Sequence, residues 1–318
     1  MTGRPYPYRG GVSVYSATVA IASSFCPLKA RPPLLGRWMI WRRVGRMSKP
    51  PTVIDTHCHL TGKRFADDLP EVLARAQAVG VAHCVLIGTG IDDALAAVAL
   101  AADYPDRVSV AAAIDPFSAH ALDGAVDDGV AALAALADAA PLVAIGECGL
   151  DYHYDLDPRP LQRAWVTAQL ALAAQLGLPV ILHVRDAHDD MLALLAEHPG
   201  VCGTVHCFTG DVAQAERYLA LGWYLSCSGM VTNPRAEALR QAVAAIPDDR
   251  LLLETDAPYL APMAHRGRRC EPAFVVATLA DVAALRQQDV AQVAAVTTAN
   301  ARRLLALPGA DSDTAAGG

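Results

Sequence analysis

Six histidine and acidic residues are spaced along this sequence in a pattern that could hold divalent metal ions. They are His57, His59, Glu147, His183, His206 and Asp256. Imidazole and carboxylate groups are the donors that zinc, manganese and magnesium ions take in proteins. Side chains two positions apart on a strand share a face, so His57 and His59 can bind one ion together. Six ligands exceed the needs of one tetrahedral ion and fit two ions with a bridging carboxylate better.

The metal interpretation depends on the joint pattern, because a single histidine at a strand end is more often a hydrogen-bonded structural residue. Four of the ten histidines occupy equivalent places in a repeat. An unpaired Glu147 or Asp256 would be costly to bury in its apolar segment, and metal coordination supplies a partner. A salt bridge to Arg185 or to another barrel residue is the alternative for these carboxylates. The other six histidines, including His153 and His265 in loops near the expected site, are interpreted mostly as surface or loop residues.

The elements that must position these residues follow from an alternation of short β-rich runs with Ala/Leu-rich stretches of helical period. Each ligand closes or follows one run. The eight expected strands are 52–57, 81–88, 107–114, 142–147, 179–184, 201–206, 223–228 and 250–255. We therefore predict an α/β fold, a TIM (β/α)8 barrel, whose strands converge with their carboxyl ends at one face. An open doubly wound sheet is the alternative, although it would more often carry a Gly-rich phosphate loop, which this chain lacks.

Composition divides the 318 residues into three parts. We predict a basic N-terminal extension over residues 1–50, a barrel domain over 51–307 and a disordered tail over 308–318. Residues 1–50 contain nine basic and no acidic residues, and the remainder carries a formal charge of −16. We interpret the extension as disordered or as lying upstream of a translation start at Met47. The acidic remainder argues against binding duplex nucleic acid through a broad basic surface.

The sequence also indicates a compartment. No apolar stretch is long enough for a transmembrane helix, and no export signal is evident. The eight cysteines show no paired spacing, which favours a reducing compartment. Cys58, Cys148 and Cys207 directly follow predicted ligands, so we expect them to face the covering helices as apolar filler. We predict a cytoplasmic protein without membrane contact or an obligate protein partner.

Five segments, in order, resemble the TatD family of metal-dependent deoxyribonucleases. They read DTHCHL at 55–60, GECGLD at 146–151, LHVRDA at 182–187, HCFTG at 206–210 and ETDAPYL at 254–260. The similarity continues in HRGRRCEP at 265–272 and NARRL at 300–304; it spans about Val53 to Leu307 and covers none of residues 1–46. Two positions depart from the family pattern, Thr61 where Asp is usual and Cys270 where Asn is usual. Both lie near the expected mouth, where they bear on substrate preference.

The resemblance implies an amidohydrolase-type barrel with two divalent ions (Mg²⁺, Mn²⁺ or Zn²⁺) and hydrolysis of DNA phosphodiesters, in the manner of a 3′–5′ exonuclease. It places His57, His59, Glu147 and Asp256 around one ion, and Glu147, His183 and His206 around the other. Such ions lower the pKa of a bound water from ~15.7 towards ~7 and so supply metal-bound hydroxide. Glu147 is expected to bridge the ions.

Further roles are assigned by chemistry. Asp256 is our candidate general base, since it can orient a water and receive its proton. Arg185 and Arg266 are candidate phosphate contacts, with ordinary ion pairs as the alternative. Tyr152, Tyr154 and Tyr259 are best placed to stack on bases, although each could simply pack its loop.

The pattern of predicted metal ligands is compatible with more than one substrate and function class. We expect single-stranded DNA or DNA ends, because a duplex is too wide to reach the bottom of a barrel mouth. The main rival is a related barrel hydrolase acting on an amide, ester, lactone or phosphotriester, which the same metal site would serve. A catalytically silent barrel that binds nucleic acid or protein is a second rival.

Overall fold

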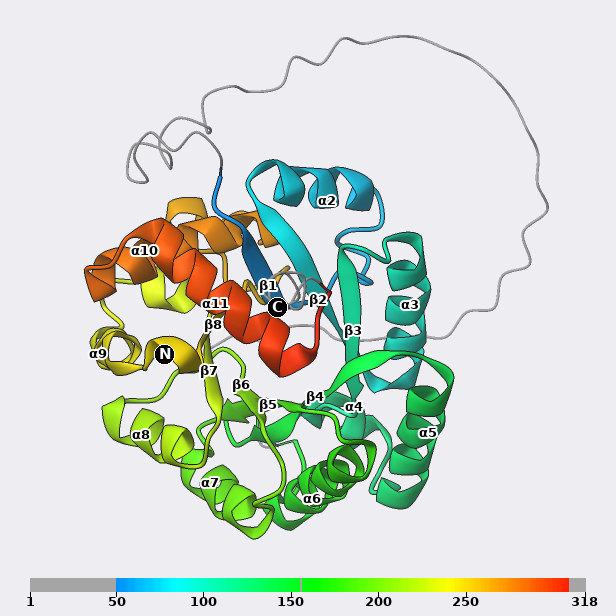
Figure 1. Ribbon diagram of the computed structural model, residues 1–318. Helices are drawn as coiled ribbons and strands as arrows, with labels where there is room; N and C mark the ends of the chain where they lie inside the picture. The colour runs from blue at the N-terminus through cyan, green and yellow to red at the C-terminus, as the bar shows by residue number, and fades with distance from the viewer. Residues whose placement is uncertain (1–49, 155, 309–318) are drawn as a thin grey trace, which may run out of the picture. The chain divides into compact units, whose positions relative to one another are not determined.

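The computed structural model describes residues 50–154 and 156–308, and these contain one sheet of eight parallel strands in the order β1 to β8 (Figure 1). The strands are β1 Val53–Cys58, β2 Val81–Thr89, β3 Val108–Ala113, β4 Leu142–Asp151, β5 Val180–Arg185, β6 Gly203–Val205, β7 Tyr224–Cys227 and β8 Leu251–Leu253. All eight predicted strands are present. The extension and tail predicted over 1–50 and 308–318 lie almost entirely outside the described residues.

The first and last strands meet, so the sheet is a nearly closed TIM barrel rather than an open sheet. Thr56 Oγ1 donates a hydrogen bond to the Leu253 carbonyl at 3.0 Å. Farther along, the His59 amide donates to the Ala257 carbonyl at 2.7 Å. The predicted barrel is confirmed, and the doubly wound alternative is wrong.

Ten α-helices of the described residues connect and cover the strands (Figure 1). They are α2 Leu69–Ala78, α3 Gly90–Asp103, α4 Pro116–Ala121, α5 Val126–Ala139, α6 Arg159–Leu176, α7 His188–Glu197, α8 Val212–Ala220, α9 Glu237–Ala245, α10 Val275–Arg286 and α11 Val290–Leu305. Helix α6 is an example of how the sequence determines these helices: its apolar residues Trp165 and Leu172 lie on one face and are buried. Gly177 then ends the helix in the left-handed conformation that glycine adopts readily. None of the helices in this part of the chain is long and apolar enough to cross a bilayer.

Helix α11 covers the amino-terminal end of the barrel. Thr298 Oγ1 donates to the Thr52 carbonyl at 3.0 Å, and Asn300 Nδ2 donates to the Leu251 carbonyl at 2.9 Å. Leu305 of the same helix packs with barrel side chains such as Ile87 and Leu252. This end is therefore filled with apolar side chains, which leaves the carboxyl end for a polar site.

Strand lengths differ most from prediction at β4, β6 and β8. Strand β4 continues to Asp151, four residues beyond its predicted end, while β6 and β8 are only three residues long. Cys58 and Cys148 lie buried in the main apolar core, as expected. The prediction for Cys207 is wrong: β6 ends before it, its φ is 42°, and its sulfur contacts Ser228 Oγ at 3.1 Å.

Candidate metal centre

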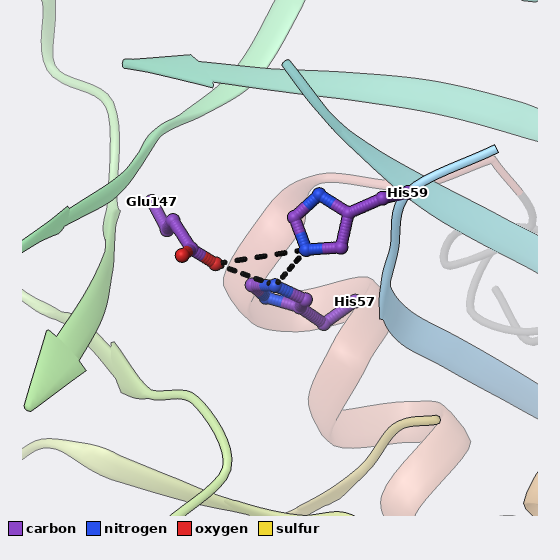
Figure 2. A group of neighbouring side chains, drawn as sticks. All are labelled: His57, His59 and Glu147. Carbon is purple, nitrogen blue, oxygen red and sulfur yellow. Dashed lines mark hydrogen bonds and ion pairs between the residues drawn. The ribbon is translucent and has the colours of Figure 1, made fainter. Parts of the chain in front are cut away.

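The first and fourth strands bring His57, His59 and Glu147 together at the carboxyl end of the barrel (Figure 2). The Nε2 atoms of the two histidines lie 3.2 Å apart. Glu147 Oε2 lies 2.7 Å from His57 Nε2, and Asp256 Oδ1 lies 3.3 Å from His59 Nε2. His-x-His thus presents both rings to one point, as the period-two argument predicts.

A second histidine pair lies on the other side of Glu147. His183 Nδ1 and His206 Nε2 are 3.2 Å apart. Glu147 Oε1 is 3.6 Å from His183 Nδ1, and Oε2 is 3.5 Å from His206 Nε2. The single carboxylate therefore faces both pairs. The structure brings all six predicted residues into one cluster, contributed by β1, β4 and β5 and by the segments that follow β1, β6 and β8.

The donor set fits divalent cations. Two nitrogens bound to one tetrahedral zinc at ~2.0–2.1 Å stand about 3.3 Å apart. Both imidazole pairs have this separation. Because Asp151 accepts the N–H of His183 at Nε2, a neutral His183 directs the lone pair of Nδ1 towards His206, where a cation can accept it. The groups that could hold an ion are His57, His59 and Glu147; Glu147, His183 and His206; and His57, His206 and Glu254.

The electrostatics of the cluster favour positive charge. Burial disfavours the imidazolium of His59, yet the hydrogen bond with Asp256 and the charge of Glu147 raise the pKa of His59 to about 9. Burial likewise opposes protonation of His206, but Glu147 and Glu254 raise its pKa to about 9. Burial raises the pKa of the Glu147 carboxyl, and its interactions with the His206 and His57 imidazoles outweigh burial and hold that pKa well below its usual range. Burial lowers the pKa of His57, which therefore favours the neutral, metal-binding form. Surroundings that stabilise a proton on these rings also stabilise a metal cation.

Three buried carboxylates that the sequence analysis did not single out hold the ligands in place. Asp151 Oδ2 accepts a hydrogen bond from His183 Nε2 at 3.0 Å, which leaves Nδ1 facing Glu147. Glu254 Oε1 lies 3.5 Å from His206 Nδ1 and accepts the Cys207 amide at 2.6 Å. Asp55 accepts the backbone amide and the hydroxyl of Thr255 at 2.9 and 2.6 Å.

A signal for these positioning residues exists in the sequence. Asp55 stands two residues before His57, Glu254 two before Asp256, and Asp151 four after Glu147. Even spacings place side chains on the same face of an extended segment. The period-two argument that found His-x-His could have found all three.

The backbone beside the ligands is unusual. Cys207, after His206, and Asp256 have φ values of 42° and 57°, in the left-handed region that non-glycine residues rarely adopt. Such conformations concentrate at functional sites. On β4, a side chain at Gly149 would overlap the His183 carbonyl, so glycine allows β4 and β5 to approach closely beside the centre.

Arg185, the last residue of β5, and Arg266, in the segment after β8, lie at the carboxyl end of the barrel but outside the cluster. The Arg185 guanidinium is 5.0 Å from the centre of the Tyr154 ring, and Arg266 lines a pocket between the segments after β7 and β8. The suggested salt bridge of Arg185 to Glu147 or Asp256 is not present. The two histidines expected in loops near the site have ordinary contacts: His153 lies 3.4 Å from an Asp186 oxygen, and His265 stacks on a phenylalanine ring.

The aromatic residues at the mouth divide by exposure. Tyr154 and Tyr259 are 48% and 42% exposed, and Tyr259 stands edge-on to His59 with ring centroids 6.1 Å apart. Tyr152 is half-buried, and its hydroxyl donates to Asp190 at 2.5 Å. Phe117, absent from the sequence prediction, is 47% exposed and lies 5.4 Å from the Tyr154 ring.

Comparison with known proteins identifies relatives along the whole barrel. Residues 54–306 match the sequence profile of the family described as "TatD related DNase". The chain is 37% identical over 254 residues to "Uncharacterized metal-dependent hydrolase YabD" of Bacillus subtilis, covering 79% of this chain and 98% of that protein. It is 40% identical over 264 residues to "3'-5' ssDNA/RNA exonuclease TatD" of Klebsiella pneumoniae, covering 80% and 98%.

Among solved structures, the fold is similar to that of the TatD homologue YJJV from Escherichia coli. The TM-score is 0.74 at 32% sequence identity, and the match covers 80% of this chain and 98% of the other. The similarity therefore includes the whole barrel with the carboxyl-end segments that carry the cluster.

Proposed function

This chain belongs to the family of TatD-related DNases, and from that membership we propose that it is a divalent-metal-dependent hydrolase that removes nucleotides from single-stranded DNA. The proposal depends on one observation: the structure contains two pairs of histidines, the facing nitrogens of each pair are 3.2 Å apart, and Glu147 lies between the two pairs. Relatives of this chain include proteins described as 3′–5′ ssDNA/RNA exonucleases.

We propose that the centre holds two ions. Four carboxylates contact the four histidines: Glu147, Asp151, Glu254 and Asp256. With neutral imidazoles and ionised carboxylates, the formal charge of four minus matches two divalent cations. His57, His59, Glu147 and Asp256 would hold one, and Glu147, His183 and His206 the other. When bound, the ions supply Lewis acidity towards the phosphoryl oxygens and an activated water at neutral pH. The imidazole content favours Zn²⁺ or Mn²⁺, and Mg²⁺ is compatible with the carboxylates.

The protein's own groups then have defined tasks. Asp256 is partly exposed at the mouth, with 14% of its side chain accessible, so its carboxylate can orient the attacking water and take its proton. Asp151 and Glu254 fix the rings of His183 and His206, so that the nitrogens facing Glu147 stay unprotonated. Arg185, at the end of β5, and Arg266, in the segment after β8, would contact substrate phosphates.

The rim of the mouth favours a single strand. Tyr154, Phe117 and Tyr259 present exposed rings around the centre, and exposed rings can stack on unpaired bases of any sequence. The acidic charge of the chain after residue 50 disfavours docking of a whole duplex. We also assign the enzyme to the cytoplasm, where the seven free cysteines of the described residues would stay reduced.

The test compares matched DNA substrates. The purified chain is incubated with one labelled sequence as a single strand, a blunt duplex and a covalently closed circle, with Mg²⁺, Mn²⁺ or Zn²⁺ and an EDTA control. We expect the single strand to shorten from its 3′ end with a bound metal and to persist in EDTA. Rapid cutting of the closed circle would instead indicate an endonuclease. Hydrolysis of an amide, ester or lactone panel without cleavage of any DNA would favour the rival hydrolase class.

A further inference from the structure

A pocket of about 460 Å³ opens between the segments that follow β7 and β8. Its walls include three exposed apolar side chains, Met230, Leu260 and Met263, which are 36–40% exposed. Arg235 and Arg266 line the same pocket, and neither side chain forms an ion pair with any described residue. Apolar walls with a few cationic groups are the composition of a site for a small ligand that has an apolar face and an anionic group.

The pocket is held in shape by contacts between its two segments. Thr232 Oγ1 accepts the Met263 amide at 2.8 Å and donates to the Gly229 carbonyl at 2.6 Å. At the base, Gly229 lies so close to Leu260 that a side chain there would overlap the Leu260 carbonyl. These contacts hold the segments around Thr232 and Met263 together, and ligand pockets are usually preformed in this way.

The pocket borders the metal centre. Met230 sulfur lies 3.7 Å from the sulfur of Cys207, the residue after His206. On the other wall, Leu260 follows Tyr259, whose ring stands against His59. A polymer whose phosphate lies at the metal centre would therefore have its neighbouring residue at the pocket.

We propose that this pocket binds the penultimate nucleoside of the single strand, whose 3′ oxygen is the leaving group of the reaction. Its base would lie between Met230, Leu260 and Met263, with the thioethers against the ring. Arg235 and Arg266 would contact the 5′ phosphate of the same nucleoside. The two arginines favour this nucleoside over the terminal one. In a reaction at the 3′ end, the only phosphate of the terminal nucleoside is the one that is cleaved, so no second phosphate is left for the arginines to contact. The inference rests on the proposed exonuclease function and adds a binding subsite to it.

The experiment measures variants of the pocket residues on DNA strands that lack the matching base or the matching phosphate charge. Three labelled oligothymidylates are compared: an unmodified strand, a strand with a propanediol spacer for the penultimate nucleoside, and a strand with a neutral methylphosphonate at that nucleoside's 5′ position. The variants are Met230→Ala combined with Met263→Ala, and Arg235→Ala. Matched controls are Leu221→Ala, which is 42% exposed at the end of α8, and Arg107→Ala, which precedes β3 at the opposite end of the barrel.

We expect the methionine variant to lower kcat/KM for the unmodified strand about tenfold and to leave the spacer strand unchanged from wild type. Arg235→Ala should lower kcat/KM for the unmodified strand by a similar factor, without effect on the methylphosphonate strand. Both controls should match wild type. An equal loss on modified and unmodified strands would indicate a structural role and overturn the inference.

A binding measurement separates this inference from the proposed function. Fluorescence anisotropy of the same labelled strands measures their affinity for the protein, and so detects binding at the pocket even if no strand is cleaved. We expect Arg235→Ala to reduce the slope of log K against log salt by about 0.7 in magnitude, the value for one phosphate contact on a single strand. Equal affinity and equal salt dependence of wild type and variant would overturn the subsite. Absence of cleavage by the wild type with every metal would count against the exonuclease proposal instead.

Discussion

Replacing Asp151 by Asn should weaken one metal site while leaving the fold intact. Asp151 is buried, and its Oδ1 accepts the amides of His153 and Tyr154 at 3.0 and 2.9 Å. An asparagine oxygen can keep both of these bonds. Its amide group would then face His183 Nε2 and need an acceptor there. His183 would have to move its proton to Nδ1, the atom that faces Glu147 and His206, where a proton blocks metal binding.

The magnitude follows from the role of this carboxylate. Loss of such an outer partner of a metal-binding histidine weakens affinity by about 10–100-fold, or about 1.4–2.7 kcal/mol. The other ion should be nearly unaffected, because the side chain of Asp151 contacts none of its ligands His57, His59 and Asp256.

Titration of the ion-free protein with zinc against a chromogenic chelator resolves the two affinities. Asp115→Asn is the matched control, since Asp115 is also buried and its side chain accepts the amides of Phe117 and Ser118 at the start of α4. Asparagine caps helices as well as aspartate, so this variant should bind both ions normally. Two unchanged affinities in Asp151→Asn, or an equal loss in the control, would refute the reasoning.

Three further predictions concern packing, pH and the N-terminus. Gly149→Ala should destabilise the fold by about 1–3 kcal/mol in chemical unfolding and lower zinc occupancy at His183, because the new side chain overlaps the His183 carbonyl; unchanged stability would contradict the close approach. Hydrogen bonds from Arg269 and Arg75 lower the Asp68 pKa from 3.8 to about 2. A carboxyl whose pKa is lower in the folded than in the unfolded state stabilises the fold at pH values above its unfolded pKa. The wild type should therefore have a higher free energy of unfolding than Asp68→Asn at pH 7, and this difference should fade between about pH 4 and 2. A pH-independent difference would contradict this. A chain that begins at Met47 should melt and turn over like the full chain, and a large loss of either would assign residues 1–46 a role.

Much of the centre could be predicted from the sequence because two geometric rules act together. Period two places His57 and His59 on one face, and a parallel barrel brings every strand's carboxyl end to one mouth. These rules need no knowledge of loop conformation. They therefore predicted the convergence of residues as distant as His57 and Asp256, and that convergence is observed.

The remaining features depend on where strands end and how loops pack. Asp151 was not among the predicted site residues, because β4 was expected to stop at Glu147; the strand in fact continues to Asp151 and pairs with β5. Cys207 does not face the covering helices as predicted, because β6 ends at Val205 and the alternation of strand faces does not extend to residue 207. The pocket beside the centre arises from contacts between the segments around Thr232 and Met263, which no local pattern encodes.

The most direct test of the two-ion centre is the number of ions bound per chain, measured by elemental analysis of wild type, Glu147→Ala, His183→Ala and His206→Ala. Glu147 contacts both histidine pairs, whereas His183 and His206 belong to one of them. We expect about two ions in wild type, about one in either histidine variant and nearly none in Glu147→Ala. Full occupancy in all three variants would contradict a centre in which one carboxylate joins two ions.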